Sequence, residues 1–181
     1  SGAGAGRRNG RRARPRLARH LDRLTAMLVD GLVAIRHGNG RPAIRLHGPS
    51  SMRSRGATAA FTMESAQGEV IPFWIVEEAA REAALAIRGG CFCNPGCAER
   101  AFGLGPAAVG PCLDTLGDEF TIPRLAECLG GGPVGAVRIS LGLGSVASDV
   151  DRVLTMLAQF ADEFPRRPAA GTATECRVLF R

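Results

Sequence analysis

Apolar residues recur at helical spacing in two parts of the chain. The first run, in steps of three or four residues, comprises Leu17, Leu21, Leu24, Leu28, Leu32 and Ile35. The second run comprises Val150, Val153, Leu154, Leu157 and Phe160. Such spacing places the apolar side chains on one face of a helix, so two amphipathic helices are predicted. A Gly-Asn-Gly sequence at residues 38–40 ends the first helix, and Pro165 ends the second.

Shorter stretches between these two helices predict strands and further helices. The expected strands are residues 43–46, 57–63, 85–88 and 134–141, the third of them buried. Pro72 suits the first turn of a helix that ends near Ala84. Two short helices in residues 98–116, an irregular loop in residues 117–132 and an N-cap at Ser145 complete the prediction. This order predicts an α+β fold with a small, mostly antiparallel sheet and helices on one face.

The positive charge is concentrated at the N-terminus. Residues 1–23 hold eight arginines and one acidic residue, Asp22, a charge of +7, and the remainder carries −1, which together give the net charge of +6. A Gly/Ala/Arg tail of this kind is typically solvated, and charge alone is weak support for nucleic-acid binding. We expect residues 1–16 to be a disordered basic leader, residues 17–164 the folded domain and residues 165–181 a tail, with nucleic acid an unlikely partner.

The remaining composition bounds the chemistry and the compartment. All 23 basic residues are arginine, so the chain has no lysine for a Schiff base. No apolar run is long enough to span a membrane, and no signal peptide is visible. We therefore expect a cytoplasmic protein with no membrane partner, whose cysteines are reduced thiols rather than disulfides.

Three cysteines crowd into the sequence RGGCFCNPGC, at Cys91, Cys93 and Cys97. A structural zinc site usually needs four ligands, often in CxxC pairs, and this spacing does not supply them, so no metal is expected. Two readings stay open on spacing alone. The cysteines are small residues in a turn, or one of them is a nucleophile, activated as a thiolate by a following helix N-terminus.

The stretch RGGCFCNPG resembles the signature of the C-terminal, small domain of class V aminotransferases, which are pyridoxal-phosphate (PLP) enzymes of fold type I. It is most similar to molybdenum cofactor sulfurases, with cysteine desulfurases further away. AIRLHGP followed by GATAAF resembles the paired strands that open this domain, and GGPVGAVRISLGLGSVASDVDRVL resembles its closing strand, turn and helix. The resemblance runs from about Leu17 to Phe160.

The resemblance implies a role for three residues. Cys93 matches the cysteine that attacks the sulfur of the substrate, and Arg138 matches the arginine that binds the substrate carboxylate. Arg88 matches the arginine that begins the loop motif, and we place it with Arg138 as substrate-binding. Cys91 is secondary. His47 and Asn94 are expected to be structural. Cys97 matches poorly, because the sulfurase loop usually has one more residue before its third cysteine.

The resemblance also implies a cofactor, PLP, bound mainly by a large domain that is absent from this chain. The expected function is transfer of sulfur from an amino-acid substrate, with cysteine as the candidate, through an enzyme persulfide, in a protein that is homodimeric at full length. The chain alone, having no lysine, is expected to be inactive. Two alternatives stay open: an aminotransferase, lyase or epimerase of the same superfamily without persulfide chemistry, or a non-catalytic domain remnant.

Overall fold

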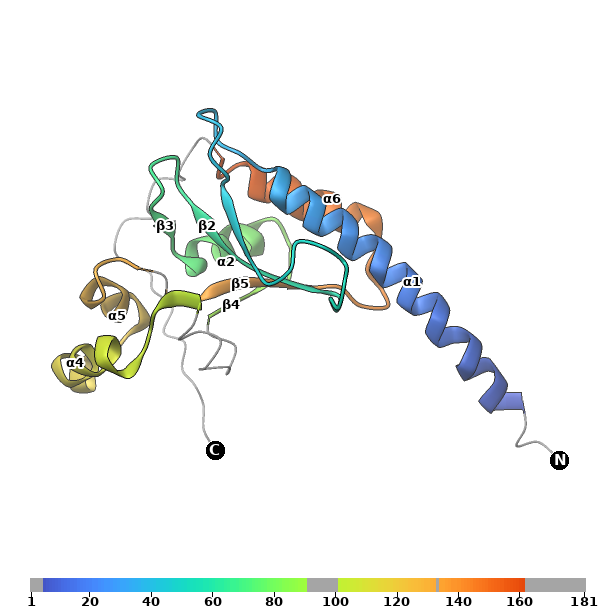
Figure 1. Cartoon of the computed structure of the whole chain (residues 1–181), viewed down its shortest axis with the longest axis horizontal. Helices are drawn as coiled ribbons and strands as arrows, with labels where there is room; N and C mark the ends of the chain where they lie inside the picture. Colours follow the sequence, from blue (N-terminus) through green and yellow to red (C-terminus); the bar gives the residue numbers. More distant parts are fainter. Residues whose placement is uncertain (1–4, 91–100, 133, 162–181) are drawn as a thin grey trace.

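The computed structural model describes residues 5–90, 101–132 and 134–161, with side chains from Arg14 onward (Figure 1). In chain order the elements are α1 (Ala5–Ala34), β1 (Ile44–His47), β2 (Thr58–Glu64), β3 (Val70–Ile71), α2 (Phe73–Glu82), β4 (Arg88–Gly90), α4 (Pro106–Leu116), η1 (Gly117–Glu119), α5 (Ile122–Cys128), β5 (Ala136–Ser140) and α6 (Ala147–Ala158).

The strands form one sheet in the order β1-β2-β5-β4, with β3 paired to the end of β2. Each of these pairings is antiparallel. Strands β5 and β2 are neighbours although they are far apart in the sequence, because α2, β4 and the helices after β4 intervene between them. The α+β fold with a small antiparallel sheet, predicted from the order of elements, is confirmed.

One face of the sheet carries the hydrophobic core. Phe61 and Met63 of β2 and Val137 of β5 are almost fully buried on this face, and Leu28 of α1 and Leu157 of α6 pack into the same cluster. Helix α2 contributes further buried residues to it and contacts both β4 and β5. Because side chains alternate along a strand, these three helices cover one face, and the polar side chains of the strands project from the other.

The first helix begins earlier than predicted. The apolar pattern placed its start near Leu17, whereas α1 begins at Ala5. Alanine and arginine, which both favour helix, are frequent in residues 5–16, and Pro15 lies within the helix. The predicted division into leader, domain and tail remains a prediction. No helix within the described residues has the length and apolarity needed to cross a membrane.

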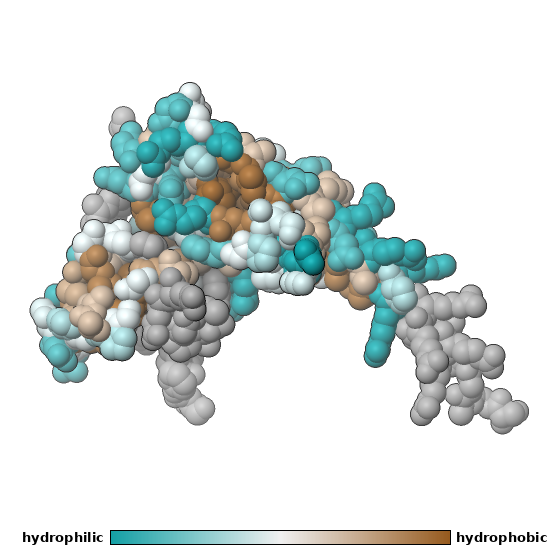
Figure 2. Space-filling view, in the orientation of Figure 1, coloured by the Kyte–Doolittle hydropathy of each residue, from teal (hydrophilic) through white to brown (hydrophobic). Residues whose placement is uncertain are grey.

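Residues 117–132 form a second correction. They contain η1 and α5, where an irregular loop was predicted. The local signals were present: Thr121 is the N-cap, its Oγ1 accepts a hydrogen bond from the Arg124 backbone N–H at 3.3 Å, and Pro123 lies in the first turn. We call α4, η1 and α5 (residues 106–128) the hairpin. Figure 2 shows hydrophobic residues on its surface, and Leu113 is 44% exposed.

Two cysteines of the hairpin are joined by a disulfide, which contradicts the prediction of reduced thiols. Cys112 of α4 and Cys128 at the end of α5 are bonded, with their Cα atoms 5.8 Å apart. The prediction failed because the two residues are isolated in sequence, and only the turn between the two helices brings them together. The number and spacing of cysteines in the sequence therefore do not indicate this disulfide, which only the tertiary structure reveals.

Two local predictions shift by a few residues. The strand expected at residues 85–88 begins at Arg88, an exposed residue, while Leu85 and Ile87 pack against the core ahead of the strand. The N-cap of α6 is Val146, whose backbone N–H donates to Asp149 Oδ2 at 3.0 Å. Ser145, predicted as this cap, instead accepts a hydrogen bond from the Gly142 N–H and holds the preceding turn.

Candidate functional site

Arg138 projects from the polar face of the sheet. It lies in β5 between Val137 and Ile139, which are both buried in the core, so alternation along the strand directs Arg138 to the opposite face. The residue is half-buried, and its Nε atom is enclosed by protein. A guanidinium held by a central strand is a rigid donor fork, suited to two parallel hydrogen bonds with a carboxylate.

Arg88 lies directly opposite Arg138. The two residues are paired in register across the antiparallel strands β4 and β5. Side chains at such positions lie on the same face with Cβ atoms roughly 5 Å apart, and like charges placed there repel each other. A carboxylate or another anion bound to both guanidiniums would offset this repulsion. The structure therefore brings together the two arginines that the sequence predicted as substrate-binding.

Strand β4 is held close to β5 by small residues and by α2. A Cβ atom added at Gly135 would come within 2.9 Å of the Gly90 backbone, so only glycine fits where the two strands meet. On the other side, the Gly89 backbone N–H donates to Glu77 Oε1 of α2 at 2.6 Å. These contacts fix the position of Arg88 relative to Arg138.

The row of residues that contains the two arginines crosses the whole sheet. Arg138 pairs with Ala60 of β2, and Ala60 pairs with His47 of β1. The four residues His47, Ala60, Arg138 and Arg88 therefore form one row across β1, β2, β5 and β4, with their side chains on the polar face. We call them the arginine row. Ala60 contributes only a methyl group between the imidazole and the Arg138 guanidinium.

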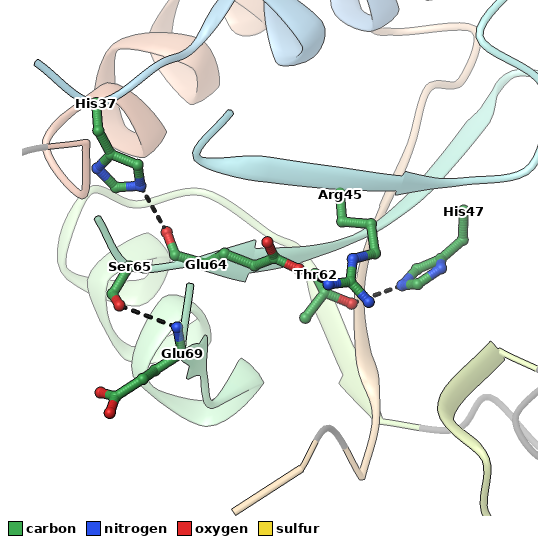
Figure 3. Close-up of polar contacts among 7 residues, drawn as sticks. All are labelled: His37, Arg45, His47, Thr62, Glu64, Ser65 and Glu69. Carbon is green, nitrogen blue, oxygen red and sulfur yellow. Dashed lines mark hydrogen bonds and ion pairs between the residues drawn. The ribbon is translucent and has the colours of Figure 1, made fainter. Parts of the chain in front are cut away.

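His47 is fixed by a hydrogen bond, as Figure 3 shows: its Nε2 atom lies 2.6 Å from the Thr62 hydroxyl oxygen. Arg45, in the same strand, forms an ion pair with Glu64, which lies in β2 beyond Thr62. Burial, followed by the positive charge of Arg45, lowers the pKa of His47 below its usual value, while Glu64 opposes the shift. The lowered pKa favours the neutral form of the imidazole.

We call residues 91–97, which include Cys91, Cys93 and Cys97, the cysteine segment. Described residues on either side of it in sequence meet the arginine row at its two ends. Strand β4, which holds Arg88, ends at Gly90 immediately before it, and after it the Phe102 ring meets the His47 ring edge-on, with centroids 5.2 Å apart. The predicted nucleophile Cys93, with Cys91, Asn94 and Cys97, lies outside the described residues. Within the described ranges, no group of three or more His, Cys, Asp or Glu residues could hold a metal ion.

Sequence reasoning treated His47 as structural and did not connect it with Arg138. The predicted strand, residues 43–46, ended one residue before His47, whereas β1 includes His47 and so places it on the same face as Arg45. Its alignment with Arg138 depends on the pairing order β1-β2-β5, which the sequence alone does not reveal.

A small α+β domain with two arginines paired across its sheet, one of them in the strand that precedes the cysteine segment in sequence, fits the domain predicted from the sequence resemblance. The chain is homologous to molybdenum cofactor sulfurases, and that resemblance is confirmed. It is 30% identical over 176 residues to the molybdenum cofactor sulfurase of Drosophila ananassae, a match that covers 91% of this chain. It is 32% identical to those of Chaetomium globosum, over 84% of the chain, and Neurospora crassa, over 80%.

These relatives are much longer than this chain. The match covers 20% of the Drosophila ananassae and Chaetomium globosum proteins and 15% of the Neurospora crassa protein. The chain thus spans about a fifth of the length of the curated relatives it matches. No family model matches the chain.

Proposed function

We propose that this chain is the C-terminal, small domain of a PLP-dependent sulfur-transfer enzyme of the molybdenum cofactor sulfurase type. One observation carries the proposal: Arg88 and Arg138 face each other in register on the polar side of the sheet, where the cysteine segment begins. Sulfur transfer as the class of reaction is supported by homology to proteins named molybdenum cofactor sulfurase.

Arg138 would bind the carboxylate of the amino-acid substrate, which we take to be cysteine. Two parallel hydrogen bonds from a planar guanidinium fix the orientation of a carboxylate as well as its position. Arg88, on the edge strand and exposed, would add a second positive charge from the side of the cysteine segment. The pair would hold the substrate so that its sulfur lies near that segment.

Cys93 would receive the sulfur. Its thiolate would attack the sulfur atom of the substrate, so that a sulfur–sulfur bond forms as the carbon–sulfur bond breaks. The products would be alanine, after protonation of its carbon, and a persulfide on Cys93, from which a downstream acceptor takes the terminal sulfur.

The residues of this chain do not fit PLP as a covalent cofactor site. The cofactor is held by a lysine Schiff base in enzymes of this kind, and the chain contains no lysine. When bound, PLP supplies an electron sink. We assign the lysine that would hold it to another part of the protein or complex, and to this chain only the carboxylate and sulfur-accepting groups.

The test uses the complete protein or complex, isolated from its native cells through a tag on this chain. After addition of L-cysteine and alkylation of thiols, peptide mass spectrometry should find one extra sulfur atom on Cys93. The variant Cys93→Ser should abolish sulfur transfer, whereas the matched variant Cys91→Ser should retain it. Arg138→Ala should lower kcat/KM for cysteine about 10- to 100-fold, because a charge-assisted hydrogen bond contributes about 1.5–3 kcal/mol.

Two results would contradict the proposal. Turnover of an amino acid that is unchanged in Cys93→Ser would exclude persulfide chemistry for that substrate and favour an aminotransferase, lyase or epimerase. Sulfur loading that is unchanged in Arg138→Ala would show that the carboxylate is bound elsewhere.

A further inference from the structure

The arginine row extends beyond the two arginines to His47, and its geometry allows a ligand to contact both parts. Neighbouring strands lie about 4.8 Å apart, so the Cα atoms of His47 and Arg138, two strands apart, are separated by roughly 10 Å. Ala60, between them, has the only side chain that β2 contributes to this row, and it is a single methyl group. A small molecule held by Arg138 can therefore reach the imidazole over Ala60.

The imidazole of His47 is held in place by two independent contacts. Thr62, which is 4% exposed, bonds to Nε2, and Phe102 packs against the ring from the segment that follows the cysteines. Figure 3 shows the second ring nitrogen, Nδ1, on the opposite side of the ring from this hydrogen bond. A side chain fixed by both its neighbours is suited to position a ligand, because little rotamer entropy is lost on binding.

The surroundings of His47 favour a neutral ring. Burial, followed by the positive charge of Arg45, lowers the pKa of His47, while Glu64, the ion-pair partner of Arg45, opposes the shift. A neutral imidazole has one donor and one acceptor nitrogen. When Nε2 carries the proton and donates it to the Thr62 hydroxyl, Nδ1 is the acceptor, and it can receive an N–H from a ligand whose carboxylate is bound to Arg138.

We propose that His47 is a positioning residue that selects amino acids over simple carboxylic acids, by accepting a hydrogen bond from the α-ammonium group of a substrate whose carboxylate is held by Arg138. The proposal rests on the proposed function, because it uses the same carboxylate site. Beyond that function, the proposal explains how the site would recognise the ammonium group of a free amino acid when the substrate binds or the product leaves.

The test compares two probes that differ in one group. L-Alanine and propionate have the same carbon skeleton and carboxylate, and only alanine carries the ammonium group. Binding of each probe to the full chain is measured by NMR titration, with retention of the fold checked by circular dichroism. The wild-type chain should bind alanine several-fold more tightly than propionate, since one hydrogen bond of about 0.5–1.5 kcal/mol corresponds to about 2- to 10-fold.

Variants separate this proposal from the proposed function. His47→Ala should remove the preference for alanine and leave propionate binding unchanged, and His47→Gln, which keeps an acceptor, should restore part of the preference. Thr62→Val should weaken the preference because the ring loses its anchor. Arg138→Ala should weaken the binding of both L-alanine and propionate.

Three results would overturn one proposal or both. If His47→Ala retains the alanine preference while Arg138→Ala weakens both probes, the His47 proposal is wrong and the carboxylate site stands. If Arg138→Ala affects neither probe, the carboxylate site of the proposed function is wrong and the His47 proposal falls with it. If neither probe shifts the resonances of the arginine row at saturating concentration in the wild-type chain, both are wrong.

Discussion

The sheet with its three helices and the hairpin are held together in different ways. The core of the sheet unites nineteen buried residues, most of them from α1, α2, α6 and the strands, whereas the hairpin buries three: Cys112, Leu116 and Leu125. The hairpin also leaves Leu113, Phe120 and Ile122 more than a third exposed. Figure 1 shows it set apart from α1 and α6, with the sheet between them.

This difference shows that a covalent bond can replace a hydrophobic core where the chain is too short to form one. With only three buried side chains, the hairpin depends on the Cys112–Cys128 disulfide, which restricts its unfolded conformations. The sheet, with its large shared core, depends on apolar burial.

The largest predicted effect is on the sheet. Phe61 is fully buried in β2 and pairs in register with Val137 and with Leu46. Phe61→Ala should lower the global free energy of unfolding by about 3–5 kcal/mol, through lost burial and the cavity left behind. The matched variant Leu125→Ala in the hairpin should leave the global transition nearly unchanged. Urea denaturation followed by circular dichroism measures both, and equal losses would show that the two regions unfold as one unit.

The second prediction concerns the hairpin. Replacing Cys112 and Cys128 by serine should lower the local stability of α4 and α5 by up to about 3 kcal/mol, the loop-entropy value for a cross-link of about this span; the sequence separation here is 16 residues. Hydrogen exchange of the hairpin amides should accelerate, while exchange in β2 and β5 should not.

Reduction of the wild-type chain should have the same effect as the double substitution, and the reductant should not alter the variant. Accelerated exchange throughout the sheet in the double variant would contradict the separation of the two regions.

The same comparison explains how far the sequence predicted the fold. In α1 and α6, apolar residues at helical spacing predicted the helices, because these faces are buried in the large core. In the hairpin, few positions are buried, so periodicity gives a weak signal, and the Thr121 cap and Pro123 were the better indicators of α5. Its two cysteines were wrongly predicted to be reduced, because the disulfide between them depends on how the two helices pack.

In the candidate site too, residues in local sequence motifs could be predicted, whereas a residue placed by tertiary structure could not. Arg138 and Arg88 could be predicted as substrate-binding from sequence, because they lie in motifs that resemble a known family, and this role remains a prediction. The position of His47 beside them depends on strand order and register, which no local pattern specifies. The role of Cys93 remains a prediction.

The third prediction tests the point where the hairpin returns to the sheet. Gly135→Ala would place a Cβ atom 2.9 Å from the Gly90 backbone and 3.0 Å from the Phe73 ring. Because backbone cannot yield easily, we expect β4 to move away from β5, with a loss of about 1–3 kcal/mol in the free energy of unfolding. Displacement of Arg88 should also weaken propionate binding.

Gly142→Ala is the control for this variant, since a Cβ atom there has no neighbour within 4 Å. Denaturation and NMR titration of the two variants measure the difference. Equal stability and equal propionate affinity would mean that the contact between Gly135 and Gly90 does not set the spacing of the two strands.

The smallest predicted effect is a pH dependence at His47. Burial, followed by the charge of Arg45, lowers the pKa of His47 in the folded chain, and Glu64 only partly opposes this. Below the unfolded value of about 6.5, the unfolded chain then binds more protons than the folded chain at this residue. The stability contribution is therefore complete above pH 6.5 and is lost as the pH falls through the lowered folded pKa.

Urea midpoints at pH 7.5 and 5.5 should differ more in the wild-type chain than in His47→Gln, because glutamine does not titrate. Comparing the two proteins removes the contributions of other titrating groups. An NMR titration of the His47 ring should give a midpoint below 6.5, and a midpoint above that value would show that Glu64 outweighs burial and Arg45.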